Sequence, residues 1–115
     1  MSIKRIESGA RMSQAVVANG FVFLAGQVAP DPSGDVVSQT RQVLGEIDRL
    51  LALAGSSKER ILTATIYLAD VATFADMNKA WEAWVAPDGK PARATVEAKM
   101  VAPEYRVEIQ VTALL

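Results

Sequence analysis

The sequence predicts an α+β domain of two layers, in which two helices cover one face of a mixed six-stranded sheet. Three observations lead to this class. An Asn19-Gly20 pair between two apolar runs predicts a hairpin. The stretches that begin at Asp35 and Asp70 have helical periodicity. The last residues of the chain alternate between apolar and polar, which is typical of a strand. The order of strands, helix, strand, helix and two strands fits a single domain over residues 1–115.

The N-terminal part predicts three strands. Residues 3–7 form a short candidate strand, and residues 12–18 and 21–25 flank the Asn-Gly pair. Gly26 follows the third strand and has two interpretations. It marks either a bulge or strand end, or a place where the backbone approaches a ligand closely.

The first helix is predicted between two end signals. Turn-forming residues occupy 30–34, Asp35 is a candidate N-cap, and Gly55 is a candidate C-terminal stop. Between them one stripe contains Val36, Thr40, Val43, Leu44, Ile47, Leu50, Leu51 and Ala54. The stripe predicts packing on the sheet, with the charged residues solvated.

A strand over residues 61–68 follows a polar connection at 56–60 and is apolar on both faces, which is typical of a strand inside its sheet. Asp70 is then predicted to cap a second helix. Its stripe contains Phe74, Met77, Ala80, Trp81, Trp84 and Val85. The two tryptophans share a face, which favours a core or subunit contact over a ligand platform.

Two strands near the C-terminus carry the candidate catalytic residues. Residues 92–98 place Arg93, Thr95 and Glu97 on one face, and in the last strand Glu108 alternates with apolar residues. Arg93 and Glu108 would point outward from apolar backing and converge on one pocket. An arginine can hold an anionic substrate, and a carboxylate can activate water. The same alternation is also typical of a solvated strand face without a site.

Composition excludes several classes of function. Half of the residues are hydrophobic and the net charge is −1, with lysine and arginine scattered, which argues against nucleic acid as a partner. No apolar run approaches the roughly 20 residues of a membrane span, and residues 1–5 do not resemble a signal peptide. We therefore expect a cytoplasmic protein.

The absence of cysteine and histidine limits the chemistry further. Disulfides, thiolate nucleophiles, Cys/His zinc sites and histidine bases are impossible. No cluster of Asp and Glu has metal-ligand spacing, so no metal is expected. Catalysis would rely on carboxylate, Arg, Lys, Tyr, Ser/Thr, backbone amides or water.

The number of helices predicts an assembly. Two helices cover only one face of the sheet, so the apolar residues of the strand at 61–68 leave an uncovered patch on the other. Self-association is the simplest cover, and it would place sheet-edge residues such as Arg93 beside a neighbouring copy.

Several segments, in the right order, resemble the RidA/YjgF family of reactive-intermediate deaminases, and a branch apart from its best-studied members. The likeness extends over nearly the whole chain. It is carried by Arg11-Met-Ser-Gln-Ala-Val16, Phe23-Leu-Ala-Gly-Gln-Val28, Ile61-Leu-Thr-Ala-Thr-Ile-Tyr-Leu68, Pro91-Ala-Arg-Ala-Thr-Val-Glu-Ala98, Ala102-Pro103 and Val107-Glu-Ile109.

This resemblance implies a chorismate-mutase-like fold, a homotrimer with sites in the clefts between subunits, and no cofactor. The implied reaction is hydrolysis of 2-imino or enamine acids to 2-keto acids and ammonia. Arg93 would bind the substrate carboxylate and Glu108 would deprotonate the attacking water. Backbone groups at Thr95 and Gly26 would line the pocket.

The chain departs from the best-studied members at three positions. Met12 replaces a tyrosine, Ala25 replaces a frequent serine, and Thr95 replaces a common cysteine. Loss of the tyrosine hydroxyl bears on substrate range and on assistance to the leaving ammonia. Arg11 either adds a second cation to the pocket or is an exposed arginine at a strand end.

Two other functions are weighed against deamination. A non-catalytic carboxylate-binding or protein-protecting oligomer could use the same cleft, because a fold can outlive an activity. A ribonuclease or translation-inhibiting role is less well supported. The sequence lacks histidine and a basic patch, and it predicts no stacked aromatic residues on a strand face.

Overall fold

The computed structural model describes residues 2–115 and has the predicted order of elements. Its six strands are β1 (Ile3–Ser8), β2 (Ser13–Ala18), β3 (Phe21–Leu24), β4 (Ile61–Leu68), β5 (Ala92–Glu97) and β6 (Val107–Leu114). Its helices are α1 (Val36–Ala54) and α2 (Phe74–Trp84), with short 3-10 turns η1 (Lys58–Arg60) and η2 (Val71–Thr73). The α+β prediction is confirmed.

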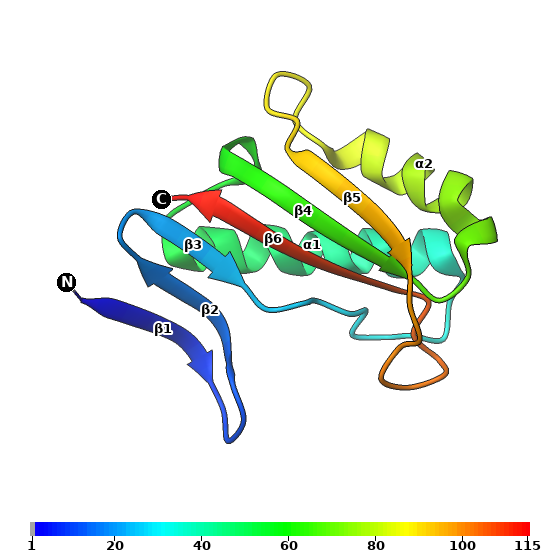
Figure 1. Ribbon diagram of the computed structural model, residues 1–115, viewed down its shortest axis with the longest axis horizontal. Helices are drawn as coiled ribbons and strands as arrows, with labels where there is room; N and C mark the ends of the chain where they lie inside the picture. Colours follow the sequence, from blue (N-terminus) through cyan, green and yellow to red (C-terminus); the bar gives the residue numbers. More distant parts are fainter. Residues whose placement is uncertain (1) are drawn as a thin grey trace.

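All six strands form one sheet in the order β1-β2-β3-β6-β4-β5 (Figure 1). β4 and β5 run parallel and every other pair is antiparallel, so the sheet is mixed as expected. β4 lies between β6 and β5, in the interior that its sequence predicts, whereas β5 forms one edge of the sheet.

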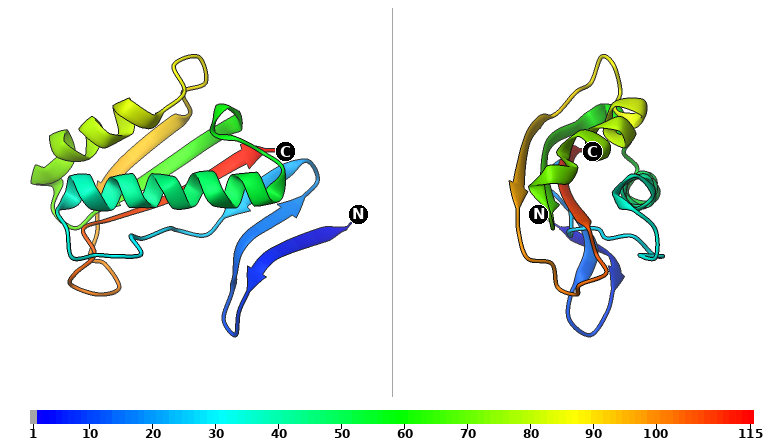
Figure 2. Two further views of the ribbon diagram at one scale, coloured as in Figure 1. Left: turned by 180° about the vertical axis from the view of Figure 1, so that it is seen from behind. Right: turned by 90° about the vertical axis from the view of Figure 1, so that its right-hand side faces the viewer.

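Both helices lie on the same side of the sheet (Figure 2). The strand residues that face them form the core, and β6 contributes a full alternating set of buried residues, Val107, Ile109, Val111 and Ala113. The opposite side, which we call the open face, has no covering layer within residues 2–115. This face carries the intervening β6 residues, including Glu108 and Gln110.

The ends of α1 match their sequence signals. The Asp35 carboxylate accepts a hydrogen bond from the Ser38 amide at 2.9 Å, and Gly55 adopts a left-handed φ of 89°. The expectation for Asp70 needs correction. Its carboxylate accepts from the Ala72 amide inside η2, so it caps this 3-10 turn, and α2 begins only at Phe74.

The Asn19-Gly20 hairpin is confirmed. Both residues have positive φ, 52° and 82°, the backbone that an Asn-Gly pair favours in a two-residue turn. The turn fixes the register of β2 on β3.

The expectation that β4 is apolar on both faces is wrong in detail. A register shift between Ile61 and Thr63 turns Ile61 toward the buried side, together with Ala64. The open face of β4 therefore carries Thr63, Thr65 and Tyr67 instead of a continuous apolar row. The exposed apolar residues on this face belong to other strands. They are Phe23 of β3, Val96 of β5 and Leu114 of β6.

No helix among residues 2–115 combines the length and the apolar character needed to cross a bilayer.

Candidate functional site

Glu108 lies on the open face of β6, half-buried, with Tyr67 of β4 as its cross-strand partner. Direct partners in a sheet project to the same face, so the phenol and the carboxylate are neighbours. Both line an open pocket of about 230 Å³, whose other wall is the segment after β5, and we call it the Glu108 pocket. Its other lining residues are Ala98, Lys99, Met100 and Val101.

Gly26 lies directly against the Glu108 carboxylate. A Cβ atom built on Gly26 would overlap Glu108 Oε2 and would stand only 2.9 Å from the carboxyl carbon. Two backbone hydrogen bonds hold this arrangement, because the Gln27 amide donates to the Ile109 carbonyl at 2.9 Å and the Ile109 amide donates back at 3.1 Å. Gly26 thus follows the end of β3 and approaches a side chain of the protein itself, and its approach to a ligand stays a prediction.

Arg93 lies on the other side of the sheet. Its register partner on β4 is Ala64, which is buried under the helices, so Arg93 points toward the helical layer at the edge strand β5. Its Nη1 donates to Asn78 Oδ1 at 2.9 Å. Its Cζ lies 5.2 Å from the Trp81 ring centroid and 5.8 Å from that of Phe74.

Burial lowers the pKa of Arg93, because desolvation disfavours the charged form, and the charge of Glu82 on α2 partly opposes this change. An arginine stays protonated in proteins nonetheless. Arg93 is therefore a partly buried cation beside two aromatic rings.

The predicted convergence of Arg93 and Glu108 is wrong within one chain. The two side chains project to opposite faces of the sheet, and β4 separates their strands. The two faces of β5 alternate as the sequence predicts, but the face toward α2 is the polar one, which carries Arg93 and Thr95. An arginine is accommodated there because α2 supplies Asn78 and two ring faces.

Three other predicted residues, Thr95, Ala25 and Gly26, divide between these two places. Thr95 shares the face of Arg93, and its Oγ1 is shielded from solvent without a hydrogen-bond partner among residues 2–115. Gly26 adjoins Glu108, and Ala25 precedes Gly26 in the chain, with its amide donating to the Gln14 carbonyl at 2.9 Å. We call Glu108, Gly26 and Ala25 the carboxylate half-site, and Arg93 and Thr95 the arginine half-site.

Arg11 and Met12 belong to neither half-site of the same chain. They lie in the connection between β1 and β2 and line a separate hollow with Glu7 and Gly9. The prediction that they line the pocket of Glu108 therefore fails within a single chain.

Sequence reasoning missed two groups of residues. Phe74, Asn78 and Trp81 surround Arg93, and their spacing of four and three on α2 could have identified one helix face with an amide between two rings. Tyr67 and Lys99 line the Glu108 pocket. The alternation of β4 places Tyr67 on a face, but strand order was needed to place it beside Glu108.

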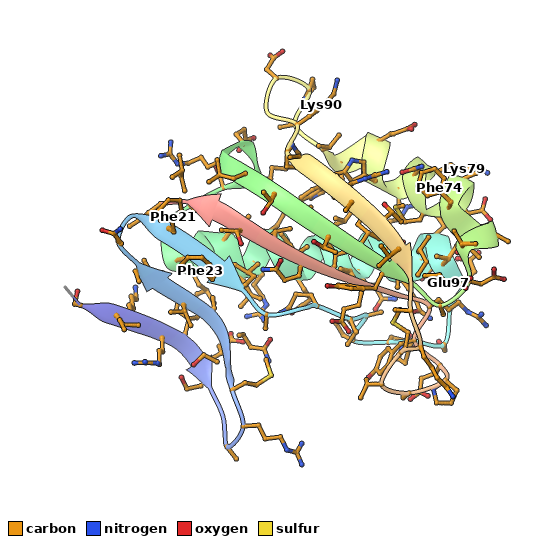
Figure 3. All side chains as sticks on the ribbon, in the orientation of Figure 1. Phe21, Phe23, Phe74, Lys79, Lys90 and Glu97 are labelled. Carbon is orange, nitrogen blue, oxygen red and sulfur yellow. The ribbon has the colours of Figure 1, made fainter. Side chains whose placement is uncertain are left out.

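Two aromatic residues of β3 lie close together, with their rings tilted by 35° instead of stacked. Phe21 and Phe23 project from the open face of β3, with ring centroids 6.0 Å apart (Figure 3). Phe23 pairs with Thr112 of β6 in the same sheet.

Within residues 2–115, no group of three or more Asp and Glu side chains is placed to hold a metal ion.

Comparison with known proteins gives full-length matches. Residues 2–115 match the family model described as endoribonuclease L-PSP. A RutC family protein of Haemophilus ducreyi is 47% identical over 98% of this chain and 97% of its own length. The RutC family protein YoaB of Escherichia coli is 44% identical over 98% of both chains.

A solved structure shows the same fold. NMB1025 of Neisseria meningitidis, described as a member of the YjgF protein family, superposes with a TM-score of 0.96 at 47% identity. The match covers 99% of this chain and 95% of that one.

Proposed function

Because the chain belongs to the RidA/YjgF family, we propose that it hydrolyses reactive 2-imino and enamine acids to 2-keto acids and ammonia without a cofactor. The observation that carries the proposal is the carboxylate of Glu108, fixed against Gly26 and facing a pocket of about 230 Å³. Such a pocket has room for a small substrate and for one water beside the carboxylate.

Glu108 is the general base in this proposal. It accepts a proton from water while the water oxygen attacks C2 of the imine, and the C=N electron pair goes to nitrogen. The resulting tetrahedral carbinolamine then collapses. Its hydroxyl proton is lost, the C–N bond breaks, and the nitrogen takes up protons and leaves as ammonia. The product is the 2-keto acid.

Arg93 recognises the substrate carboxylate. Asn78 accepts one of its N–H groups, and other donors of the guanidinium fork are left to bind a planar anion in bidentate fashion. Within residues 2–115, Arg93 makes no ion pair with Asp or Glu, so its charge is not already satisfied by a carboxylate.

A complete site in this proposal needs two copies of the chain. Arg93 and Glu108 project from opposite faces, so the arginine half-site of one copy would adjoin the carboxylate half-site of the next. Two features support this arrangement. Arg93 lies on the edge strand β5, and the open face beside Glu108 exposes Phe23, Val96 and Leu114. We propose a homotrimer, in which each cleft repeats the same pairing.

Release of keto acid tests the function. A dehydratase generates 2-iminobutanoate in solution, and 2-oxobutanoate is timed with the parent protein, with Glu108→Gln and with no addition. The parent should accelerate release, and Glu108→Gln should lose about 10²- to 10⁴-fold of that acceleration.

Equal rates with and without the parent would contradict the proposal. If the parent then still binds 2-oxobutanoate in calorimetry, the chain is a carboxylate-binding oligomer instead of an enzyme.

A further inference from the structure

Three side chains of α2 contact Arg93. The proposed reaction requires only a free guanidinium and does not itself require these contacts. One side chain of the helix, Asn78, accepts a hydrogen bond from Nη1, and two others, Trp81 and Phe74, place ring centroids 5.2 and 5.8 Å from Cζ. We propose that Trp81 and Phe74 are positioning residues that orient the Arg93 guanidinium for a ligand carboxylate. This inference rests on the proposed function. It identifies Trp81 and Phe74 as the residues that make the site selective for a carboxylate.

The chemistry of the contacts supports this role. A carboxylate partner within the chain would neutralise Arg93 and compete with an anionic ligand. Aromatic faces attract the cation through their quadrupole without occupying its N–H donors, so these stay available at the edge of the guanidinium plane. The amide oxygen of Asn78 is neutral and engages Nη1. Arg93 is thereby stabilised without losing its positive charge.

The rigidity of the surroundings adds to the argument. Trp81 is 6% exposed and packs in the core, so its ring cannot move away from Arg93 without a rearrangement of α2. A free arginine loses considerable rotamer freedom when it binds a ligand, and an arginine already fixed between rings loses less. The expected consequence is tighter binding of the carboxylate with little effect on the chemical step.

Three substitutions separate the ring contact from general stability. Trp81→Leu removes the nearer ring, Trp81→Phe keeps a ring, and Phe74→Leu removes the second ring at a half-exposed position where folding is not at risk. Trp84→Phe is the matched control, because Trp84 belongs to the same helix and contacts the cation of Lys58, at 5.4 Å, instead of Arg93. Its ring also packs on Trp81, with centroids 5.5 Å apart, and phenylalanine keeps a ring at that place.

Kinetics with 2-iminobutanoate give the first readout. Loss of one cation–ring contact should raise KM about two- to 25-fold while kcat stays near that of the parent. Trp81→Leu and Phe74→Leu should show this rise, whereas Trp81→Phe and Trp84→Phe should stay within about twofold of the parent. If the two leucine variants keep the KM of the control, or lower kcat alone, the inference is wrong.

NMR of the free protein gives a readout that needs no reaction. The Arg93 Nε–H proton near the ring faces should be shifted upfield relative to an exposed arginine, and Trp81→Leu or Phe74→Leu should reduce that shift. Arg93→Lys assigns the resonance. An unshifted Arg93 signal in the parent overturns the inference. A shifted signal in a parent that neither binds nor hydrolyses the imino acid overturns the proposed function alone.

Discussion

The carboxylate of Glu108 and the backbone of Gly26 are in direct contact, and there is no space between them for a side chain. A residue on the loop after β3 thus determines where the candidate base on β6 points. Gly26→Ala should displace Glu108 and lower kcat by about 100-fold, the effect of a misplacement on the order of 1 Å. The folded state should lose about 1–3 kcal/mol through overpacking. Keto-acid release and urea denaturation measure the two effects.

Gly45→Ala is the control for that substitution. Gly45 is an exposed residue of α1, and a Cβ there meets no atom within 4 Å. Alanine in a helix interior should stabilise the protein by about 0.5–1 kcal/mol and leave activity unchanged. A Gly26→Ala variant with the parent's kcat would show that the position of Glu108 does not govern the reaction.

Mixed oligomers test whether the half-sites come from two copies. Arg93→Ala and Glu108→Gln should each be nearly inactive. After subunit exchange at equal concentrations, about a quarter of the clefts should combine an intact Arg93 with an intact Glu108, and activity should return in that proportion. Mixing Arg93→Ala with the double variant, which leaves no intact cleft, is the control. No recovery in the first mixture would place both residues of a working site in one chain.

Tyr67 is the cross-strand partner of Glu108, and its side chain lines the same pocket. If it donates a hydrogen bond to the reacting nitrogen or to the attacking water, Tyr67→Phe should lower kcat/KM by about two- to tenfold, the worth of one neutral hydrogen bond. Tyr105→Phe, in the connection before β6, should leave kcat/KM unchanged. Identical values for the two variants would remove Tyr67 from the site.

Gln39 stabilises the two loops that lead toward the half-sites. Its fully buried amide nitrogen lies within hydrogen-bond distance of three carbonyls, which share its two hydrogens, and its oxygen accepts from the Arg106 amide at 2.9 Å. The three carbonyls belong to Pro32, Gly34 and Glu104. Gln39→Leu should cost about 3 kcal/mol of unfolding free energy, because several buried polar groups lose their partner.

Gln42→Leu is the matched control for Gln39. Gln42 also bonds to a loop, through both backbone groups of Asp31, but these hydrogen bonds are exposed and water can replace them. Its loss should cost about 0.5 kcal/mol or less by urea denaturation. Comparable losses for the two variants would contradict the importance of burial at Gln39.

The ion pair between Glu7 and Arg49 predicts a pH dependence. Hydrogen bonding by Arg49 lowers the pKa of Glu7 below its ordinary value of 4.5. The folded state therefore binds this proton less tightly than the unfolded state, and the pair stabilises the protein above about pH 4.5. As the pH falls through the lowered pKa, this contribution disappears. The melting temperatures of the parent and Glu7→Gln should differ slightly at pH 7 and converge at low pH. A difference that grows toward acid would have the wrong sign.

The fold could be predicted largely because its signals are local. Asp35, Gly55 and the Asn-Gly turn each fix backbone geometry within a few residues, and all three behave as expected. Asp70 was misplaced because a carboxylate cap looks the same in sequence before a 3-10 turn and before a helix. The bulge at Ile61 left no sequence signal, since no glycine marks it.

The sequence predicts candidate site residues but does not predict how they lie relative to one another. Alternation along a strand divides residues between two faces but does not tell which face a helix covers. Arg93 and Glu108 were therefore both placed outward, although α2 covers one of them. Strand order was the missing information, because β4 enters between β5 and β6 through a parallel pairing that no short-range pattern encodes.

If Arg93 and Glu108 serve one reaction as proposed, their placement on opposite sides of one sheet leaves an isolated molecule without a complete site. A newly synthesised chain would remain inert until it met others of its kind, so turnover per molecule would rise steeply with abundance before reaching a plateau. Dilution alone would then abolish the catalytic activity, without an inhibitor and without unfolding of the chain.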